Sequence, residues 1–375
     1  MRYSNFGKTG IKMSALGFGA MRLPMRDEGG KQVVDDDLAI PLLRRSFELG
    51  VNYVDTAPYY LEKLSEGAVG RAIKGYRDKV YISTKNPIEN DSPDDWMKRL
   101  ESSLKQLDVD YIDFYHFWGI KLEGFQRWEG LSDGPLQAAE RAKAQGLIKH
   151  LSFSYHDKAE NCKHILESGR FDSVLIQYNL LDRSNEENLA IAKENGLGVV
   201  VMGPVGGGRL GAPSDVIQGL LKDKPASTAE MALRFVLANE NVDVALSGMS
   251  EMAHLEENAK VAAATGKLTD AEIAQVKAMM TENAALAKLY CTSCNYCLPC
   301  PQEIRIPHIF NIMNNHRVYG LTDHAKAAYG QVMRGEGWVK SADATKCAGC
   351  GVCESKCPQK LPIIEQLKET HEALI

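Results

Sequence analysis

Eight of the nine cysteines in this 375-residue chain lie in its last eighty-five residues, where they form two closely spaced groups. The first group is Cys291, Cys294, Cys297 and Cys300, and the second is Cys347, Cys350, Cys353 and Cys357. A proline directly follows each group. The second group has the C-x2-C-x2-C-x3-C-P spacing of bacterial ferredoxins, and the first differs only in having two residues before its last cysteine. This spacing predicts two [4Fe–4S] clusters.

Three closely spaced thiolates can bind one face of an iron–sulfur cube, and the more distant fourth cysteine then binds the other cluster. We therefore expect Cys357 to complete the first cluster and Cys300 to complete the second. The alternative is structural zinc, because C-x2-C pairs also occur in zinc ribbons. Zinc normally takes two separated pairs, whereas here four cysteines lie within ten or eleven residues, twice. Iron–sulfur clusters are the favoured interpretation.

A second set of chemically capable residues consists of Asp55, Tyr60 and Lys85. A tyrosine with its reference pKa of about 10 is a poor proton donor at neutral pH. A neighbouring ammonium group lowers that pKa, and a carboxylate can hold the ammonium in place. Each residue alone is more simply explained as part of a structural ion pair or as a packing aromatic. All three are predicted at the ends of neighbouring strands or just beyond, which favours a catalytic proton donor.

Those strands belong to a regular alternation of short β-branched or aromatic runs with longer amphipathic stretches, from about residue 14 to residue 264. The predicted strands are 14–19, 53–55, 80–84, 111–116, 150–153, 174–177, 198–202 and 242–247. Alternating strands and helices are typical of parallel βαβ units. Eight such units predict an α/β fold, a closed (β/α)8 TIM barrel, whose active site lies where the strands end.

The chain is predicted to divide into three parts. Residues 1–268 form the barrel, and residues 269–289 form a connecting helix that begins with a capping box, Thr269 with Glu272. Residues 290–375 form a mostly helical, ferredoxin-like domain with the two clusters.

Composition excludes several classes of function. Hydrophobic residues make up 44% and charged residues 25%, which is typical of a globular protein with a full-sized core. The net charge of −5 and the absence of a long basic run give no reason to expect a nucleic-acid partner. No apolar stretch approaches the roughly 20 residues that cross a bilayer, and the first residues lack the apolar region of a signal peptide. We therefore expect a cytoplasmic protein without membrane contact.

The stretch VNYVDTAPYYLEKLSEGAVG, residues 51–70, resembles the signature of the aldo-keto reductases. So do the opening YSNFGKTGIKMSALGFGAMRL, the strand VYISTK and the segment SGMSEMAHLEENAKVA near residue 250. With the cysteine groups, the chain resembles the branch of this family that carries a C-terminal 4Fe–4S domain. The resemblance implies hydride transfer with NADPH or NADH, during which Tyr60 gives a proton to the substrate oxygen.

The sequence departs from the family pattern on the fourth strand. Family members usually have a histidine five residues after the aspartate of that strand, and here this position, counted from Asp113, is Trp118. An indole N–H can donate a hydrogen bond but cannot accept or relay a proton. His116 lies two residues earlier, and a β-bulge could bring it to the site. The alternative is that His116 is a satisfied histidine in the barrel interior.

The resemblance also implies a set of cofactor contacts. They are Met21, Ser154, Gln177, Met202, Gly248, Met249, Ser250, Glu257 and Asn258. Met202 stands where relatives place a tyrosine that stacks on the nicotinamide ring. The backbone N–H groups of 248–250, at the start of a helix, favour phosphate. Glu251 lies close to where NADP-preferring relatives have a basic residue, and a carboxylate there would repel a 2′-phosphate.

These residues favour an iron–sulfur oxidoreductase that reduces or oxidises a small carbonyl compound or conjugated alkene. Its clusters would exchange electrons with an electron-transfer protein such as ferredoxin. Hydride carries two electrons whereas each cluster carries one, so either a flavin connects them, or reduction proceeds in single-electron steps, or the clusters are structural. The alternative is a redox-sensing or electron-transfer subunit whose barrel has little turnover of its own.

Overall fold

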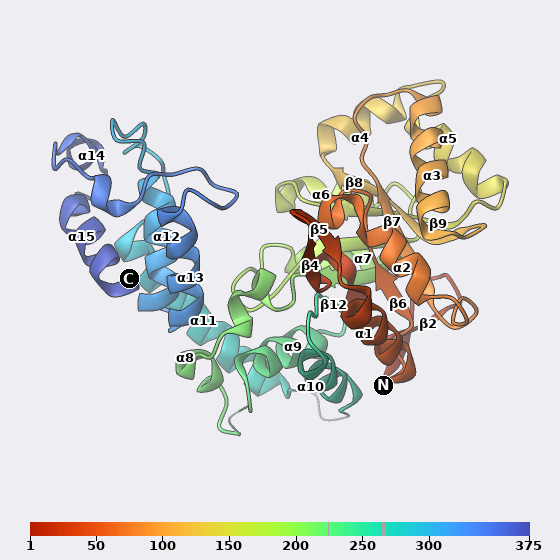
Figure 1. Ribbon diagram of the computed structural model, residues 1–375, viewed down its shortest axis with the longest axis horizontal. Helices are drawn as coiled ribbons and strands as arrows, with labels where there is room; N and C mark the ends of the chain where they lie inside the picture. Colours follow the sequence, from red (N-terminus) through yellow and green to blue (C-terminus); the bar gives the residue numbers. More distant parts are fainter. Residues whose placement is uncertain (224, 265–267) are drawn as a thin grey trace. The chain divides into compact units, whose positions relative to one another are not determined.

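The computed structural model describes residues 1–223, 225–264 and 268–375, which form two compact units (Figure 1). The first unit consists of Met1–Pro204 and Ala232–Leu268, and the second of Val205–Met231 and Thr269–Ile375. Val205–Met231 therefore packs with the C-terminal part of the chain, although in sequence it lies between two strands of the barrel. The division of the chain at residues 268 and 289 stays a prediction.

The first unit is a closed barrel of eight parallel strands, as the sequence predicts. In chain order they are β3 Leu16–Gly19, β6 Tyr53–Asp55, β7 Tyr81–Asn86, β8 Ile112–Ile120, β9 Ile148–Tyr155, β10 Ser173–Gln177, β11 Gly198–Met202 and β12 Val244–Ser247. Four more strands form two hairpins, β1 Tyr3–Asn5 with β2 Lys12–Ser14 and β4 Met25–Glu28 with β5 Lys31–Val34. Strand β12 pairs with β3 and closes the barrel.

Helices follow the strands along the chain. They are α1 Asp36–Glu48, α2 Ser65–Ala72, α3 Pro93–Leu107, α4 Leu122–Glu129, α5 Pro135–Ala144, α6 Cys162–Leu166, α7 Glu186–Glu194, α9 Thr228–Ala238 and α10 Met252–Ala263. Local sequence sets their ends. The Ser92 side chain accepts a hydrogen bond from the Asp95 N–H and caps α3, Pro93 occupies its first turn, and Asp108 ends it in a left-handed conformation.

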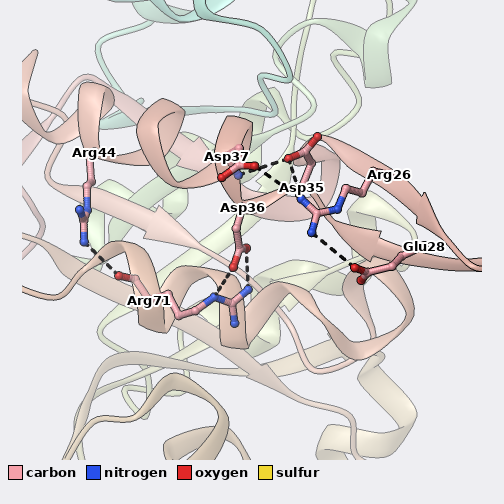
Figure 2. A network of polar contacts seen from close by, with 7 residues as sticks. All are labelled: Arg26, Glu28, Asp35, Asp36, Asp37, Arg44 and Arg71. Atoms are coloured by element: carbon pink, nitrogen blue, oxygen red, sulfur yellow. Dashed lines mark hydrogen bonds and ion pairs between the residues drawn. The ribbon is translucent and has the colours of Figure 1, made fainter.

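Charged side chains fasten the β4–β5 hairpin and the first two helices to one another, as Figure 2 shows. Arg26 of the hairpin forms ion pairs with Asp35 and Asp37, at the start of α1. Arg71 of α2 donates two hydrogen bonds, of 2.8 and 2.7 Å, to Asp36. Because each pair includes an arginine whose side chain is 43% or 49% exposed, each pair stabilises the fold by about 1 kcal/mol at most.

The second unit is helical. It contains α8 Asp215–Gln218, α11 Asp270–Tyr290, α12 Ile306–Arg317, α13 Thr322–Met333, α14 Val352–Lys356 and α15 Ile363–Leu374, of which α12, α13 and α15 pack side by side (Figure 1). The predicted capping box of Thr269 and Glu272 is present at the start of α11. Among the described residues, no helix is both long and apolar enough to span a bilayer.

An aromatic cluster fills the end of the barrel where the strands begin. Phe6, in the loop after β1, is fully buried, and its ring meets the edge of Phe114 at 5.2 Å between centroids. A Cβ on Gly198 would lie only 2.5 Å from the Phe6 ring, so a glycine is required where β11 begins. The N-terminal segment therefore closes this end of the barrel, and the opposite end carries the site.

We predict that Phe6→Ala lowers the free energy of unfolding of the barrel by about 3–5 kcal/mol, because the truncation leaves a cavity among buried rings. Urea denaturation followed by tryptophan fluorescence measures this loss. Tyr3→Phe is the control, since it removes only an exposed hydrogen bond to the Gly50 carbonyl, worth about 1 kcal/mol. A loss from Phe6→Ala no larger than the loss from the control would contradict the prediction.

Candidate functional site

A buried ion pair joins the ends of two neighbouring strands. The Lys85 Nζ of β7 lies 2.6 Å from the Asp55 Oδ2 of β6 and 2.7 Å from the Thr56 carbonyl oxygen. The Ser83 hydroxyl donates to the other Asp55 oxygen at 2.7 Å. Burial alone would lower the pKa of Lys85, but Asp55 and Tyr60 raise it above its ordinary value. The amine therefore keeps its proton inside the barrel.

Tyr60 lies directly beside this ammonium group. It follows β6 and begins the short 3-10 helix Tyr60–Lys63, and the Lys85 Nζ is 4.7 Å from its ring centroid. Burial raises the pKa of Tyr60 more than the Lys85 charge lowers it. The predicted net lowering of this pKa is therefore wrong, because the sequence did not show how little water reaches the hydroxyl. Tyr60 stays protonated at neutral pH, the state that a proton donor requires.

Trp118 lies in the site, on an irregular part of β8. The pairing of β8 with β9 shifts between Phe117 and Ile120, and Gly119 has a φ of +64° there. The Gly119 N–H donates to the Ser154 hydroxyl at 2.8 Å and fastens this bulge to β9. The Trp118 ring packs edge-on against Tyr60, with centroids 5.8 Å apart. The indole is thus one wall beside the Tyr60 ring.

A second tyrosine extends that wall. The Tyr59 ring lies 5.6 Å from the Trp118 ring, and its hydroxyl donates to Glu89 at 2.5 Å. Tyr59 is 47% exposed, so the wall reaches from the buried pair to the surface. Together the two rings make an aromatic entrance to the site.

His116 lies deeper in the barrel. His116 of β8 pairs with Lys85 of β7 in the sheet, and its side chain is fully buried. The Tyr53 hydroxyl is 3.5 Å from its Nε2. Burial, together with the charge of Lys85, lowers the pKa of His116 to about 3, so the imidazole is neutral. The bulge follows His116 in the chain and does not raise it toward the entrance, in keeping with an interior histidine.

The residues proposed to contact the nicotinamide come from three adjacent strands. Ser154 is buried in β9, and Gln177 ends β10 directly opposite Met202 of β11. Gly203 follows with a φ of +62°, and a Cβ there would stand 2.8 Å from the Gln177 amide oxygen. Gln177 and Met202 are both partly exposed, and their side-by-side register supports a shared contact to one flat ring.

The residues proposed to bind the rest of the dinucleotide surround the start of α10. Gly248 and Ser250 are exposed, whereas the Met249 side chain is fully buried, so only its backbone can contact a ligand. Asn258 is also buried and donates to the Ser247 hydroxyl at 3.1 Å. Glu257 is partly exposed, and Glu251 is exposed at the helix N-cap.

Two exposed residues that the sequence did not single out for a role also border the site. A Cβ on Gly248 would meet the Arg22 side chain at 3.3 Å, so Arg22 lies beside the proposed phosphate-binding backbone. It follows Met21, which is 46% exposed in the turn after β3. His156 lies next to Gly119. Arg22 directly follows the predicted contact Met21, and His156 lies two residues after the predicted contact Ser154. No other signal in the sequence pointed to these two residues.

The cysteines of the second unit line two cavities. Cys291, Cys294, Cys297 and Cys357 line the first, and Cys300, Cys347, Cys350 and Cys353 line the second, which Cys297 also borders. Apolar side chains back both, among them Phe310 and Ile363 in the first and Leu367 in the second. Over the described ranges, no three His, Cys, Asp or Glu side chains converge on a single metal ion. Four thiols spread around each cavity suit a cube of several irons.

Residues 15–281 match the model of the aldo/keto reductase family, and residues 290–361 match that of the 4Fe-4S dicluster domain. The chain belongs to the aldo/keto reductase family and carries a 4Fe–4S domain after the barrel. These matches and the relatives define an NAD(P)-dependent oxidoreductase.

The relatives cover the barrel. L-galactose dehydrogenase from Arabidopsis thaliana is 29% identical over 286 residues, which span 69% of this chain and 86% of the relative. NADH-specific methylglyoxal reductase from Escherichia coli is 28% identical over 240 residues, or 56% of this chain and 69% of the relative. The holo form of an aldo-keto reductase from Bacillus halodurans is a similar structure, with a TM-score of 0.63 and 28% identity over 74% of this chain and 96% of its own.

We predict that Asp55→Asn destabilises the barrel by about 3–5 kcal/mol at neutral pH, because it leaves the Lys85 ammonium buried with a neutral partner. The folded-state pKa of Lys85 is raised, so the stabilisation by the pair is present below pH ~10 and is lost as pH rises through the raised value. Urea denaturation at several pH values should show that the difference in the free energy of unfolding between wild type and Asp55→Asn becomes smaller above pH ~10.

The control is Asp36→Asn, which breaks the exposed pair with Arg71 and should cost about 1 kcal/mol or less. Equal losses of unfolding free energy in the two variants would contradict the prediction, because the buried Asp55–Lys85 pair would then stabilise the fold no more than an exposed pair.

Proposed function

We propose that the barrel transfers hydride between a nicotinamide cofactor and a small carbonyl compound or conjugated alkene, with Tyr60 as the proton donor. The observation that carries this proposal is the position of the Lys85 Nζ, 2.6 Å from the Asp55 carboxylate and 4.7 Å from the Tyr60 ring. A bound reduced nicotinamide supplies the hydride. The chain's own residues supply the proton and stabilise the charge that its departure leaves behind.

The proton moves from the Tyr60 hydroxyl to the substrate oxygen as that oxygen gains negative charge. The tyrosinate that forms is stabilised by the Lys85 ammonium, which is already present and needs no rearrangement. Asp55 keeps that ammonium charged and fixed. Because burial raises the pKa of Tyr60, the hydroxyl holds its proton until the substrate oxygen becomes basic enough to take it.

The aromatic wall supports the choice of substrate. Trp118 and Tyr59 present flat, mostly apolar surfaces beside Tyr60, which suit a small unsaturated molecule. In a conjugated alkene the proton donor acts on the carbonyl oxygen, and the hydride is added at the far carbon of the double bond. A carbonyl compound and an enone therefore place the same oxygen against Tyr60.

We infer that NADH is the preferred nicotinamide. Glu251 is exposed at the N-cap of α10, where a 2′-phosphate would meet its carboxylate. Two negative groups about 4 Å apart near a protein surface repel each other by up to about 4 kcal/mol. The E. coli relative is described as NADH-specific, which agrees with this preference.

We further propose that the second unit binds two [4Fe–4S] clusters in the two cysteine-lined cavities, three ligands from one group and one from the other. The clusters exchange single electrons with an electron-transfer protein. A surface cavity of about 920 Å³ beside Cys300 offers such a partner a place to dock, and its charged lining residues are Glu303, Arg305 and Lys340. Trp338, on the same loop as Lys340, is 97% exposed, and exposed tryptophans of this kind are enriched at protein interfaces.

A flavin would connect a two-electron hydride donor to one-electron clusters. If the protein carries one, heat denaturation releases a yellow, fluorescent compound. If the anaerobically prepared protein releases none, either reduction proceeds in single-electron steps or the clusters are structural.

Tyr60→Phe tests the proton donor. We predict that kcat for reduction falls by a factor of about 100 or more, while the Kd for NADH changes less than about twofold, because the hydroxyl acts on substrate and not on cofactor. Stopped-flow kinetics and fluorescence titration measure the two quantities. Wild-type rates in the variant would show that another group donates the proton.

Cysteine variants test how the clusters are bound. We predict that Cys300→Ser and Cys357→Ser each lower the iron content by about half, each through loss of a different cluster, whereas Cys162→Ser keeps all iron. Cys162 is a buried cysteine of the barrel whose pKa burial raises to about 12, so it makes a matched control. Elemental analysis that found zinc and no iron would overturn the cluster assignment.

A further inference from the structure

The resemblance to the aldo-keto reductases leads us to expect a histidine beside the tyrosine, and this chain has another residue there. The corresponding residue is Trp118, whose indole can donate only one hydrogen bond and cannot relay a proton. His116 does not replace it, because that side chain is fully buried and hydrogen-bonds with Tyr53. Trp118 offers a single N–H, so any further hydrogen-bond donor to a substrate oxygen at Tyr60 comes from another element.

His156 lies on the neighbouring strand end. It directly follows β9, whose last residue, Tyr155, pairs with Ile120 of β8. The His156 Cδ2 is 3.8 Å from where a Cβ on Gly119 would stand. Gly119 in turn follows Trp118, whose ring packs against Tyr60. One bulged segment thus connects the imidazole to the indole that borders the proton donor.

The backbone holds His156 at this edge. The Gly119 N–H donates to the Ser154 hydroxyl at 2.8 Å, so the bulge of β8 is fastened two residues before His156. On the other side, Asp157 accepts hydrogen bonds from the Leu122 N–H and the Asn161 amide. Its neighbours on both sides are therefore held by hydrogen bonds, while residue His156 itself is exposed.

The charge of Lys85 agrees with this position. Burial, followed by the charge of Lys85, lowers the pKa of His156. The same ammonium acts on Tyr60, so both side chains lie within its field. A neutral imidazole keeps one N–H that can donate a hydrogen bond.

We propose that His156 is a catalytic residue that donates a hydrogen bond to the substrate oxygen, opposite Tyr60, in place of the histidine that relatives carry at the position of Trp118. The inference rests on the proposed function of the barrel. His156 keeps its proton throughout, Tyr60 gives its own proton to the oxygen, and the hydride pair goes to carbon. In an enone, the same hydrogen bond polarises the carbonyl and makes the far carbon electrophilic.

The test compares His156→Phe with His164→Gln, a control at an exposed histidine that pairs with Glu129. We expect kcat/KM to fall by roughly 100-fold in His156→Phe, the usual effect of losing one donor to a developing oxyanion, with an unchanged Kd for NADH. The control should keep wild-type values. Adding Trp118→His to His156→Phe should restore part of the lost rate, because a donor returns from the neighbouring strand. Wild-type kcat/KM in His156→Phe would overturn the proposal.

A binding measurement separates this inference from the proposed function. Benzoate, whose carboxylate mimics a substrate oxygen, is titrated by ligand-detected NMR with NAD⁺ present. Weaker binding to His156→Phe but not to His164→Gln supports the proposed hydrogen bond, even if the wild-type protein reduces none of the substrates tried. Equal binding by both variants and wild type would overturn it, whatever the turnover.

Discussion

A lysine buried in a protein needs a partner of opposite charge. In this barrel Asp55 is that partner for Lys85. The two residues come from adjacent strands, β6 and β7, so the 2.6 Å contact depends on the register of those strands. Barrel closure and the aromatic cluster at the opposite end keep that register. In return, the pair keeps one positive charge at a fixed point where the strands end, and the site is organised around that charge.

Three side chains respond to this charge in different ways. Tyr60 is held beside it as a protonated phenol, because burial outweighs the ammonium in setting its pKa. His116, one strand away, is neutral for the same two reasons, burial and the lysine. His156 is also pushed toward the neutral form, but it remains exposed. Burial therefore keeps Tyr60 a neutral acid against the effect of this charge, whereas burial and the charge together favour a neutral His156, a combination that suits the reduction of a polarised oxygen.

Much of the fold and part of the site could be predicted from the sequence. The eight strands have regular apolar patterns, and the lining of the two cysteine cavities matches the grouping expected from ferredoxin spacing. The membership of Val205–Met231 in the second unit could not be predicted, because it depends on long-range packing and not on local pattern. The bulge at Gly119 and the raised pKa of Tyr60 also escaped prediction, since strand register and water exclusion exist only in the folded chain.

The central claim is that hydride passes from a nicotinamide to substrate carbon beside Tyr60. The most direct measurement mixes anaerobically prepared protein with NADH that carries deuterium at both C4 positions, together with aldehydes, ketones and enones, and analyses the products by mass spectrometry. The account predicts that each reduced product carries one deuterium on carbon. Reduced products without deuterium, formed at the same rate when the clusters alone are supplied with electrons, would contradict it.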